Sequence, residues 1–234
     1  TLGLYEDVSY RFSQWDPNDR AKYIGTEEQW NEAQGLMERI LNHLEIPYEI
    51  GIGEAAFYGP KLDIQIKNVY GKEDTLITIQ IDQMLAEQFG MVYTDKDGKQ
   101  KTPCIIHRTS IGCYERTLAL LIEKYAGAFP LWLAPVQVKL LPIADRHLDY
   151  LYEVKKQLED KGFRCEVDDR SEKIGYKIRE AQLEKVPYMV VVGDKDIENT
   201  TISIRKRKEG DLGAMTVEQF LEKIVPDRDN KVID

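Results

Sequence analysis

The sequence contains little that is typical of secreted or membrane proteins. Its three cysteines, Cys104, Cys113 and Cys165, are odd in number and have neither metal-site nor redox spacing, which predicts reduced thiols. No apolar run approaches the ~20 residues that a transmembrane helix needs. The acidic start, TLGLYEDVSY, lacks a signal-peptide pattern. These absences predict a cytoplasmic protein with no membrane partner.

Positive charge is also scarce, since 32 Lys and Arg stand against 41 Asp and Glu for a net charge of −9. That balance argues against a general affinity for nucleic acid. The charge is uneven, however, because residues 1–130 carry a net −7 and residues 131–234 only −2. A basic run at residues 205–208 could bind RNA locally, or it could simply protect a charged sheet edge.

The first half has the pattern of an α+β domain with an antiparallel sheet. A strand-like segment at residues 10–13 precedes a turn at 16–19, and Thr26 with Gln29 forms a capping box before a helix. Alternating residues predict two half-buried antiparallel strands, at 62–66 and 76–82. The expected buried face of the helix comprises Trp30, Ala33, Met37, Ile40, Leu41 and Leu44.

The pattern changes after residues 129–135, which read as a packed linker. Strands are expected at 136–142, 163–168, 188–192 and 201–207, and helices at 148–158, at 174–183 and after Thr216. The apolar strand 188–192 should be central, and the alternating strand 201–207 should lie at an edge. This alternation predicts an α/β domain with a mixed sheet flanked by helices.

The stretch PCIIHRTSIGCYERTLALLIEKYAGAFP, from residue 103 to 130, organises the first half. It predicts a buried strand that ends near Arg108, followed by a helix that Gly127 closes. Such a strand and helix could hold the imidazole of His107 and the guanidinium of Arg116 at a fixed separation, as a substrate-positioning site needs. Taken alone, however, these two residues favour a structural interpretation, as an arginine at a helix start and a core histidine.

This stretch resembles motif 3 of the class II aminoacyl-tRNA synthetases. Its continuation, YAGAFPLWLAPVQV, is similar to the threonyl-tRNA synthetase version. The resemblance implies that Arg116 is catalytic and contacts the ATP phosphates, and that His107 ligates an active-site zinc ion. GEAAFYGPKLDI and TIQID also resemble blocks of that family. They imply that Tyr58 and Gln80 bind threonine and that Thr78 faces ATP.

The second half resembles the anticodon-binding domain shared by several class II synthetases, above all in DDRSEKIGYKIREAQLEKVPYMVVVGDKDIEN. The residues that the resemblance assigns to the anticodon are Ser171, Lys173, Lys177, Asp196 and Arg205. Ser171 is commonly Asn, and Asp196 commonly Glu, in relatives.

Residues 1–130 are therefore expected to be the C-terminal part of a class II catalytic domain, and residues 131–234 an anticodon-binding domain. Motif 1, motif 2 and two zinc ligands are not found in the sequence, so the intact enzyme is expected to be longer and this segment alone inactive. The resemblance implies a homodimer that uses ATP, Mg²⁺ and Zn²⁺ to join threonine to its tRNA. Ile77, Gln83 and Thr117 depart from the family pattern. They leave open a synthetase-derived RNA-binding or regulatory module without catalysis.

Overall fold

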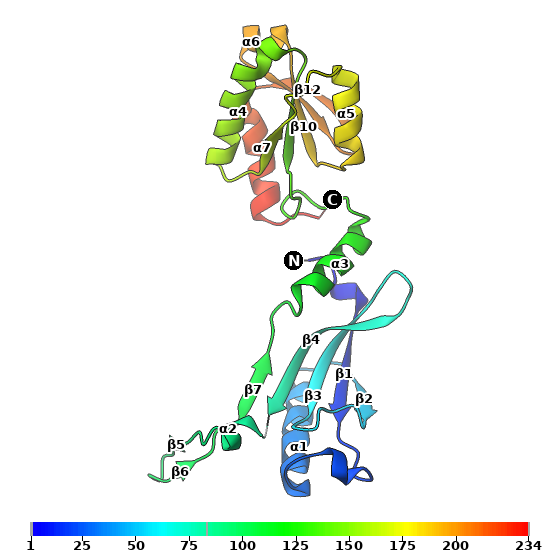
Figure 1. The fold of residues 1–234 in the computed structure, drawn as a ribbon, viewed down its shortest axis with the longest axis vertical. Helices are drawn as coiled ribbons and strands as arrows, with labels where there is room; N and C mark the ends of the chain where they lie inside the picture. The colour runs from blue at the N-terminus through cyan, green and yellow to red at the C-terminus, as the bar shows by residue number, and fades with distance from the viewer. Residues whose placement is uncertain (1, 83, 234) are drawn as a thin grey trace. The chain divides into compact units, whose positions relative to one another are not determined.

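The computed structural model describes residues 2–82 and 84–233. The chain forms two compact units, which divide between Leu120 and Leu121 within helix α3 (Tyr114–Tyr125). No helix in the described part is long and apolar enough to cross a membrane. Figure 1 shows the elements of each unit.

The first unit is built on a five-stranded sheet in the order β2-β1-β3-β4-β7. The strands are β1 (Val8–Gln14), β2 (Glu49–Ile52), β3 (Lys61–Lys67), β4 (Glu73–Asp82) and β7 (Ile105–Arg108). The antiparallel pairing of β3 with β4 confirms the prediction. The edge strand β2, which was not predicted, runs parallel to β1, so one pair of the sheet is parallel. The remaining elements are η1 (Tyr5–Asp7), η2 (Arg20–Lys22), α2 (Leu85–Gln88), β5 (Tyr93–Thr94) and β6 (Gln100–Lys101).

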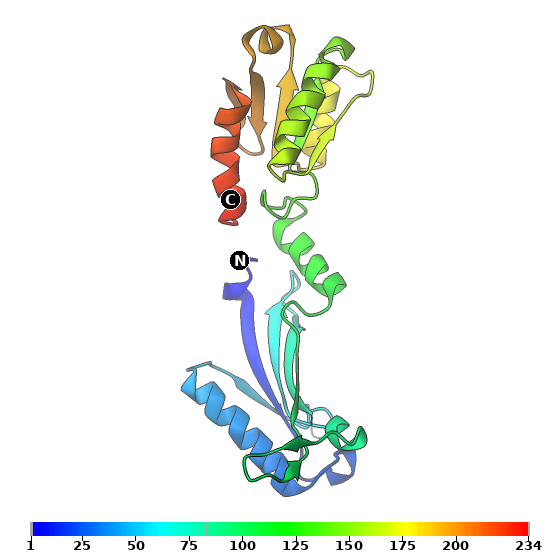
Figure 2. The ribbon, with the colours of Figure 1, turned by 90° about the vertical axis from the view of Figure 1, so that its left-hand side faces the viewer.

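Helix α1 (Glu27–His43) covers one face of this sheet, as Figure 2 shows. The predicted capping box is present, since Thr26 and Gln29 each accept a backbone N–H of the other. Ala33, Met37 and Leu41 pack on Phe12, Leu62 and Ile81 of the sheet. Ile40 and Leu44 were expected on this face, but they are 49% and 59% exposed because the contact stripe is narrower than the apolar one.

Two further burial predictions in the first unit were wrong. Strand β7 was expected to be buried, yet it lies at the sheet edge with one neighbour, and Ile106 is 65% exposed. Asp63 and Gln65 were expected on the solvent face of β3. Both are buried, because the hydroxyls of Ser13, Thr75 and Thr78 on neighbouring strands donate hydrogen bonds to them on that face.

The second unit contains a mixed sheet in the order β12-β11-β10-β8-β9. The strands are β8 (Val138–Pro142), β9 (Cys165–Val167), β10 (Tyr188–Val192), β11 (Ile202–Lys206) and β12 (Gly210–Met215). The central place of β10 confirms the prediction, and β8, β9 and β10 are parallel. The expected edge position of β11 was wrong, because β12 pairs antiparallel with it on its outer side.

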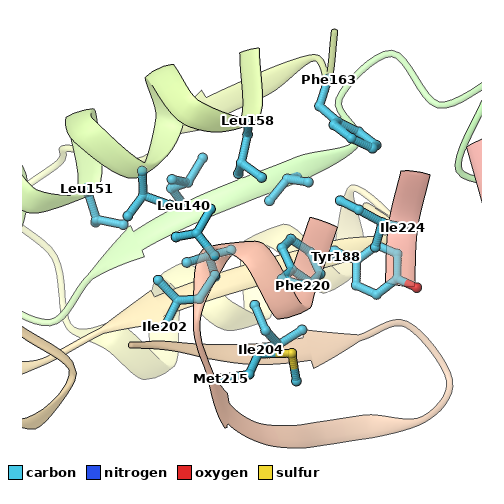
Figure 3. Packing of buried hydrophobic residues seen from close by; sticks show 14 of the residues in the cluster. Leu140, Leu151, Leu158, Phe163, Tyr188, Ile202, Ile204, Met215, Phe220 and Ile224 are labelled. Carbon is cyan, nitrogen blue, oxygen red and sulfur yellow. The ribbon is translucent and has the colours of Figure 1, made fainter. Parts of the chain in front are cut away.

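Helices cover both faces of the second sheet, as predicted. Helices α4 (Leu148–Asp160) and α7 (Val217–Asp229) lie on one face and α5 (Ile174–Leu183) on the other. Figure 3 shows the core on the α4 and α7 side, in which Leu140, Leu158, Tyr188, Ile204 and Phe220 are buried. The short helix α6 (Asp194–Asn199) was not predicted.

The segment between α3 and β8 is held in place within the second unit by arginine side chains that donate hydrogen bonds to its backbone carbonyls. The guanidinium of Arg164 donates to the carbonyls of Trp132, Ala134 and Pro135. The guanidinium of Arg207 donates to the carbonyl of Phe129 at 2.8 Å. The predicted packed linker is thus held by named hydrogen bonds within one unit.

Candidate functional site

The expected active-site residues of the first unit share the face of the sheet opposite α1. Residues that lie directly opposite on antiparallel strands project to the same face. The register places Asp63 opposite Thr78, Lys61 opposite Gln80, and Gln80 opposite His107. Leu62 pairs with Phe12, which packs under α1, so these polar residues point away from that helix.

Tyr58 reaches this polar face from the turn before β3. Its hydroxyl donates to Oε1 of Gln80 at 3.1 Å, so the two residues expected to bind threonine contact each other directly. Gly59 makes this possible, since a Cβ on it would lie 1.6 Å from the carbonyl oxygen of Ile81. Because the side-chain oxygen of Gln80 accepts the Tyr58 hydroxyl, the side-chain NH₂ group keeps two N–H donors for a ligand.

A cleft of about 380 Å³ opens on the polar face, and Thr78, Gln80, His107 and Arg116 all line it. Strands β4 and β7 supply the first three, and the first turn of α3 supplies Arg116. The structure therefore brings together four residues that the resemblance placed in one site. The other lining residues are Thr75, Leu76, Arg108, Thr109, Gly112 and Cys113.

The start of α3 is docked on β4 by two contacts. Nη1 of Arg116 donates to the carbonyl of Thr75. Gly112 has a φ of +75°, and a Cβ there would lie 1.9 Å from the carbonyl oxygen of Leu76. Only glycine tolerates both the conformation and the close approach. Together the contacts fix the position of Arg116 relative to Thr78.

His107 is held by a buried carboxylate at the end of β4. Nε2 of His107 lies 2.7 Å from Oδ2 of Asp82, whose side chain is 1% exposed. Burial opposes the charged form of Asp82. The hydrogen bonds from His107 and from the backbone N–H groups of Leu85 and Met84 outweigh burial and lower its pKa. Asp82 thus fixes the orientation of the imidazole.

The described residues do not complete a metal site around His107. They contain no group of three or more His, Cys, Asp or Glu side chains that could hold a metal ion. A protein zinc site needs at least three such ligands. His107 could therefore supply one ligand only, and the chain by itself does not fit a resident zinc ion.

Two of the three departures from the family pattern lie in the described part of the chain. Thr117 is buried, and its hydroxyl donates to the carbonyl of Ile111 at 2.6 Å, which ties α3 to the loop before it. Ile77 lies opposite Ile64 within the β3–β4 pair. Gln83 lies outside the described residues. The two described departures are accommodated by ordinary packing and hydrogen bonding.

In the second unit, three of the expected anticodon residues follow the carboxyl ends of the parallel strands. Ser171 and Lys173 are in the loop after β9, and Asp196 is in α6 after β10. Because β8, β9 and β10 are parallel, the loops that follow them lie together at the carboxyl ends of the strands. Ser171 and Lys173 are exposed. Asp196 is buried, and its carboxylate accepts from Ser203 and from the N–H of Gly193, both at 2.9 Å.

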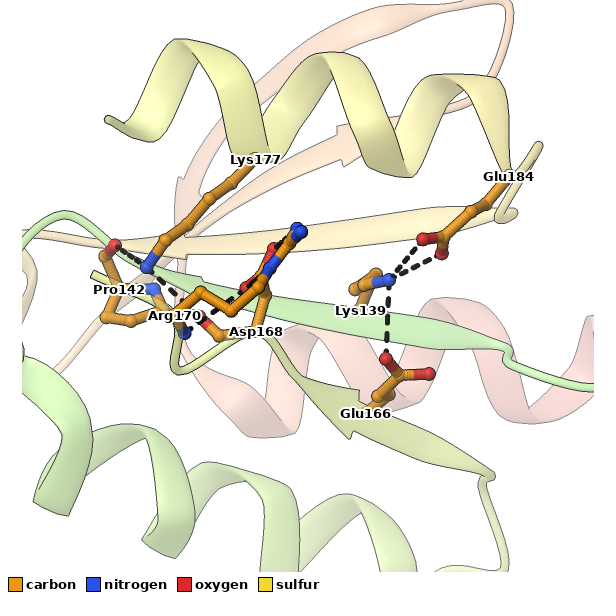
Figure 4. A network of polar contacts seen from close by, with 7 residues as sticks. All are labelled: Lys139, Pro142, Glu166, Asp168, Arg170, Lys177 and Glu184. Carbon is orange, nitrogen blue, oxygen red and sulfur yellow. Dashed lines mark hydrogen bonds and ion pairs between the residues drawn. The ribbon is translucent and has the colours of Figure 1, made fainter. Parts of the chain in front are cut away.

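Lys177 does not present its charge at the surface. It is 2% exposed, and its ammonium donates to the carbonyls of Asp168 and Pro142. Figure 4 shows this contact beside the pair of Asp168 with Arg170. The hydrogen bonds from Arg170 are the main cause that lowers the pKa of Asp168. Lys177 therefore stabilises the loop that carries Ser171 and Lys173.

The same view contains a second buried cation, Lys139 of β8. Its ammonium lies between Glu184, which it contacts, and Glu166 at 3.4 Å. Burial disfavours the charge, but the two carboxylates outweigh burial and raise the pKa of Lys139. These two ion pairs join β8 to the end of α5 and to β9, so Lys139 has a structural role.

Arg205 lies away from the other expected anticodon residues. It is opposite Met189, the second residue of β10, in a hollow of about 290 Å³. Nη1 lies 3.5 Å from Asp211, and buried Nε has no hydrogen-bond partner among the described residues. The guanidinium thus retains a donor. The lining residues are Gln182, Val186, Met189, Arg205, Lys206, Arg207, Lys208 and Gly210.

Sequence reasoning missed two carboxylates in the first unit, Asp63 and Asp82, which contact expected site residues. Asp63 was hidden because its alternation with apolar residues is typical of a solvent face. Asp82 ends the TIQID block, and its place at the end of a strand was the available signal.

Comparison with known proteins agrees with this geometry. The family described as tRNA synthetase class II core domain (G, H, P, S and T) matches residues 10–125, and the anticodon binding domain family matches residues 137–226. Threonine–tRNA ligases from Clostridium perfringens and Geobacillus kaustophilus are 61% and 47% identical over 96% and 95% of the chain. The chain spans about a third of their length, 35% and 34%.

A solved structure supports the same relationship. It is described as the RNA binding domain of threonyl-tRNA synthetase from Cryptosporidium parvum Iowa II. It aligns with a TM-score of 0.84 and 31% identity, over 96% of this chain and 55% of that one. Because both family matches and the relatives agree along nearly the whole sequence, the chain belongs to the threonyl-tRNA synthetase family of class II aminoacyl-tRNA synthetases.

Proposed function

We propose that the chain is part of a threonine–tRNA ligase, in which it supplies motif 3 and the anticodon-binding domain. The intact enzyme activates threonine with ATP and transfers it to the 3′ end of threonine tRNA. The observation that carries the proposal is the cleft, because it gathers Thr78, Gln80, His107 and Arg116 in a chain 61% identical to a threonine–tRNA ligase. No observation favours a regulatory module without catalysis.

The residues of the cleft have complementary roles in this proposal. Arg116 meets the negative charge of the ATP phosphates, and its position is fixed by the Thr75 carbonyl. Gln80 and Tyr58 bind threonine through groups that can both donate and accept. Thr78 faces ATP. Catalysis then depends on positioning and on charge stabilisation, to which Mg²⁺ bound with ATP contributes.

His107 contributes one ligand to a zinc site in the intact enzyme, and the other ligands come from outside this chain. Asp82 supports this role, because a carboxylate that binds a ligand histidine orients its ring. The family resemblance further supports a homodimer that works in the cytoplasm, with residues 1–130 and 131–234 as its two domains here.

The second unit binds threonine tRNA through its anticodon in this proposal. Ser171 and Lys173 are exposed in one loop. Lys177 and Asp196 stabilise the segments at the carboxyl ends of the parallel strands through their hydrogen bonds. Arg205 contributes a guanidinium that can stack on a base or bind phosphate.

The activity is tested by ATP–pyrophosphate exchange with the intact protein. We expect exchange with threonine and none above background with valine, because Tyr58 and Gln80 offer polar partners that valine cannot use. Gln80→Leu should raise the KM for threonine, whereas Gln88→Leu, on the short helix α2 outside the cleft, should not. Equal exchange with threonine and valine would contradict the proposal.

A further inference from the structure

The polar face of the first sheet contains a carboxylate to which no role has been given above. Asp63 of β3 is 2% exposed as a residue and lies directly opposite Thr78 of β4. Its Oδ1 accepts the hydroxyl of Thr78 at 2.8 Å. Its Oδ2 accepts the hydroxyl of Ser13 at 3.0 Å and pairs with the ammonium of Lys61. The carboxylate thus joins three strands beneath the cleft.

The direction of the Asp63–Thr78 hydrogen bond follows from the chemistry of the two groups. A carboxylate paired with an ammonium carries no proton and can only accept. Thr78 must therefore donate its only hydroxyl proton to Asp63. Since Thr78 lines the cleft, the lone pairs that remain on its Oγ are what it can offer to a ligand.

We propose that Asp63 is a positioning residue that fixes the Thr78 hydroxyl as a hydrogen-bond acceptor, so that Thr78 selects a donor group of the nucleotide. This inference rests on the proposed function and deepens it. An acceptor repels phosphate oxygens, so Thr78 contacts the nucleoside part of ATP, where the donors are the ribose hydroxyls and the exocyclic amine. Arg116 remains the group of the cleft that meets the phosphates.

The hydrogen bonds of Asp63 do more than packing of the sheet requires. A buried carboxylate is costly unless it is paired and hydrogen-bonded, and packing alone would be served by apolar residues of similar volume. Ser13 and Lys61 satisfy one oxygen of Asp63, so the other oxygen is left for Thr78 alone. That arrangement determines where the Thr78 proton points.

The geometry is tested first in the chain of 234 residues, without any activity. Asp63→Asn, Thr78→Val and the double variant are compared by thermal unfolding. If the bond exists, the two changes are not additive, and the double variant loses clearly less than the sum of the single shifts in melting temperature. Additive shifts would overturn the inference even if the intact enzyme is active.

The function of the bond is tested in the intact enzyme by the KM for ATP in pyrophosphate exchange. Asp63→Asn and Thr78→Val should each raise that KM roughly 3- to 10-fold, the range of one hydrogen bond. The melting temperature of each variant is measured alongside. Thr78→Ser, which retains the hydroxyl, should stay near the wild-type KM.

Glu73→Gln is the matched control. Glu73 also accepts a serine hydroxyl and pairs with a cation in this sheet, at 3.0 Å from Ser9 and 3.2 Å from Arg11, but it does not line the cleft. It should lower the melting temperature without changing the KM for ATP. An equal KM effect of Glu73→Gln and Asp63→Asn would overturn the positioning role.

The polarity of Thr78 is tested with 2′-deoxy-ATP, 3′-deoxy-ATP and purine riboside triphosphate, each of which lacks one donor. The KM penalty of Thr78→Val should disappear with one of them. A penalty that persists with all three would overturn the donor assignment. Absence of threonine-dependent exchange by the wild type would contradict the proposed function instead, while the unfolding experiment would still decide the Asp63–Thr78 bond.

Discussion

His107 and Arg205 are single residues whose surroundings differ in a way that matters for their expected roles. His107 lines a cleft with three other expected site residues, and its ring is oriented by Asp82. Arg205 lies apart from Ser171 and Asp196, in a hollow of its own. The neighbours of His107 therefore support its expected role. The role of Arg205 must be tested by whether its loss affects cognate and changed anticodons differently.

In the intact protein, His107→Ala should lower bound zinc and threonine activation together, because one ligand of the metal is lost. Zinc is measured by metal analysis and activation by pyrophosphate exchange. His43→Ala, in an exposed histidine at the end of α1, is the control and should retain both. Full zinc occupancy in His107→Ala would refute the assignment.

Arg205→Ala should weaken binding of threonine tRNA by ~1–3 kcal/mol, the usual cost of losing an arginine that reads a base. The loss, measured by filter binding at fixed salt, should be larger for the cognate anticodon than for a changed one. Lys208→Ala, in an exposed lysine of the same basic run, should reduce binding equally for both RNAs. An equal loss for Arg205→Ala would make it a phosphate contact only.

At the scale of elements, the close approach of α3 to β4 depends on Gly112. Gly112→Ala should destabilise the first unit by more than the ~1–2 kcal/mol that a left-handed conformation costs alanine, since the new Cβ would also meet the Leu76 carbonyl. Gly98→Ala separates the two effects, because Gly98 has a φ of +76° with nothing within 4 Å. Equal losses in thermal unfolding would show that the contact contributes nothing.

The loop after β9 is expected to be sensitive to acid. The hydrogen bonds from Arg170 lower the pKa of Asp168, so their stabilisation is present above the unfolded pKa of ~3.9 and is lost as the pH falls through the folded pKa. Asp168→Asn should therefore reduce stability at pH 7 but flatten its decline between pH 5 and 2. Asp169→Asn, in the exposed neighbour, is the control, and an unchanged acid profile in Asp168→Asn would contradict the prediction.

Elements with strong local signals were predictable from the sequence, and elements defined by their neighbours were not. The capping box at Thr26 and the helices at 174–183 and after Thr216 are encoded locally and were confirmed. Strand β12 was missed because Gly210 and Gly213 have low strand propensity, and without it β11 was taken for an edge. The burial of Asp63 was equally invisible, since Ser13 and Thr78 come from other strands.

At the scale of the whole molecule, the two units differ in how completely they can act alone. Each has its own sheet and core, but the cleft of the first offers Arg116 and His107 without a group of three possible metal ligands among the described residues. We expect the 234-residue chain to form no measurable threonyl-adenylate, because motif 2 is not found in its sequence. The loss of one charge contact in the transition state raises the activation free energy by ~2.7–4 kcal/mol.

The same chain should bind an anticodon stem-loop of threonine tRNA detectably, as measured by fluorescence anisotropy. A stem-loop with a changed anticodon is the control and should bind more weakly. Pyrophosphate exchange above background by the purified chain would contradict the first expectation.

The carbonyls that Arg164 and Arg207 bind also decide where the second unit can be cut from the rest. A polypeptide that starts at residue 131 would lose the Phe129 carbonyl that Arg207 binds, as well as the Ala126 carbonyl that accepts Lys185. One that starts at residue 121 would keep both. A protease should accordingly leave residues 126–137 attached to the anticodon-binding fragment, so the shortest stable fragment begins no later than residue 126, directly after α3.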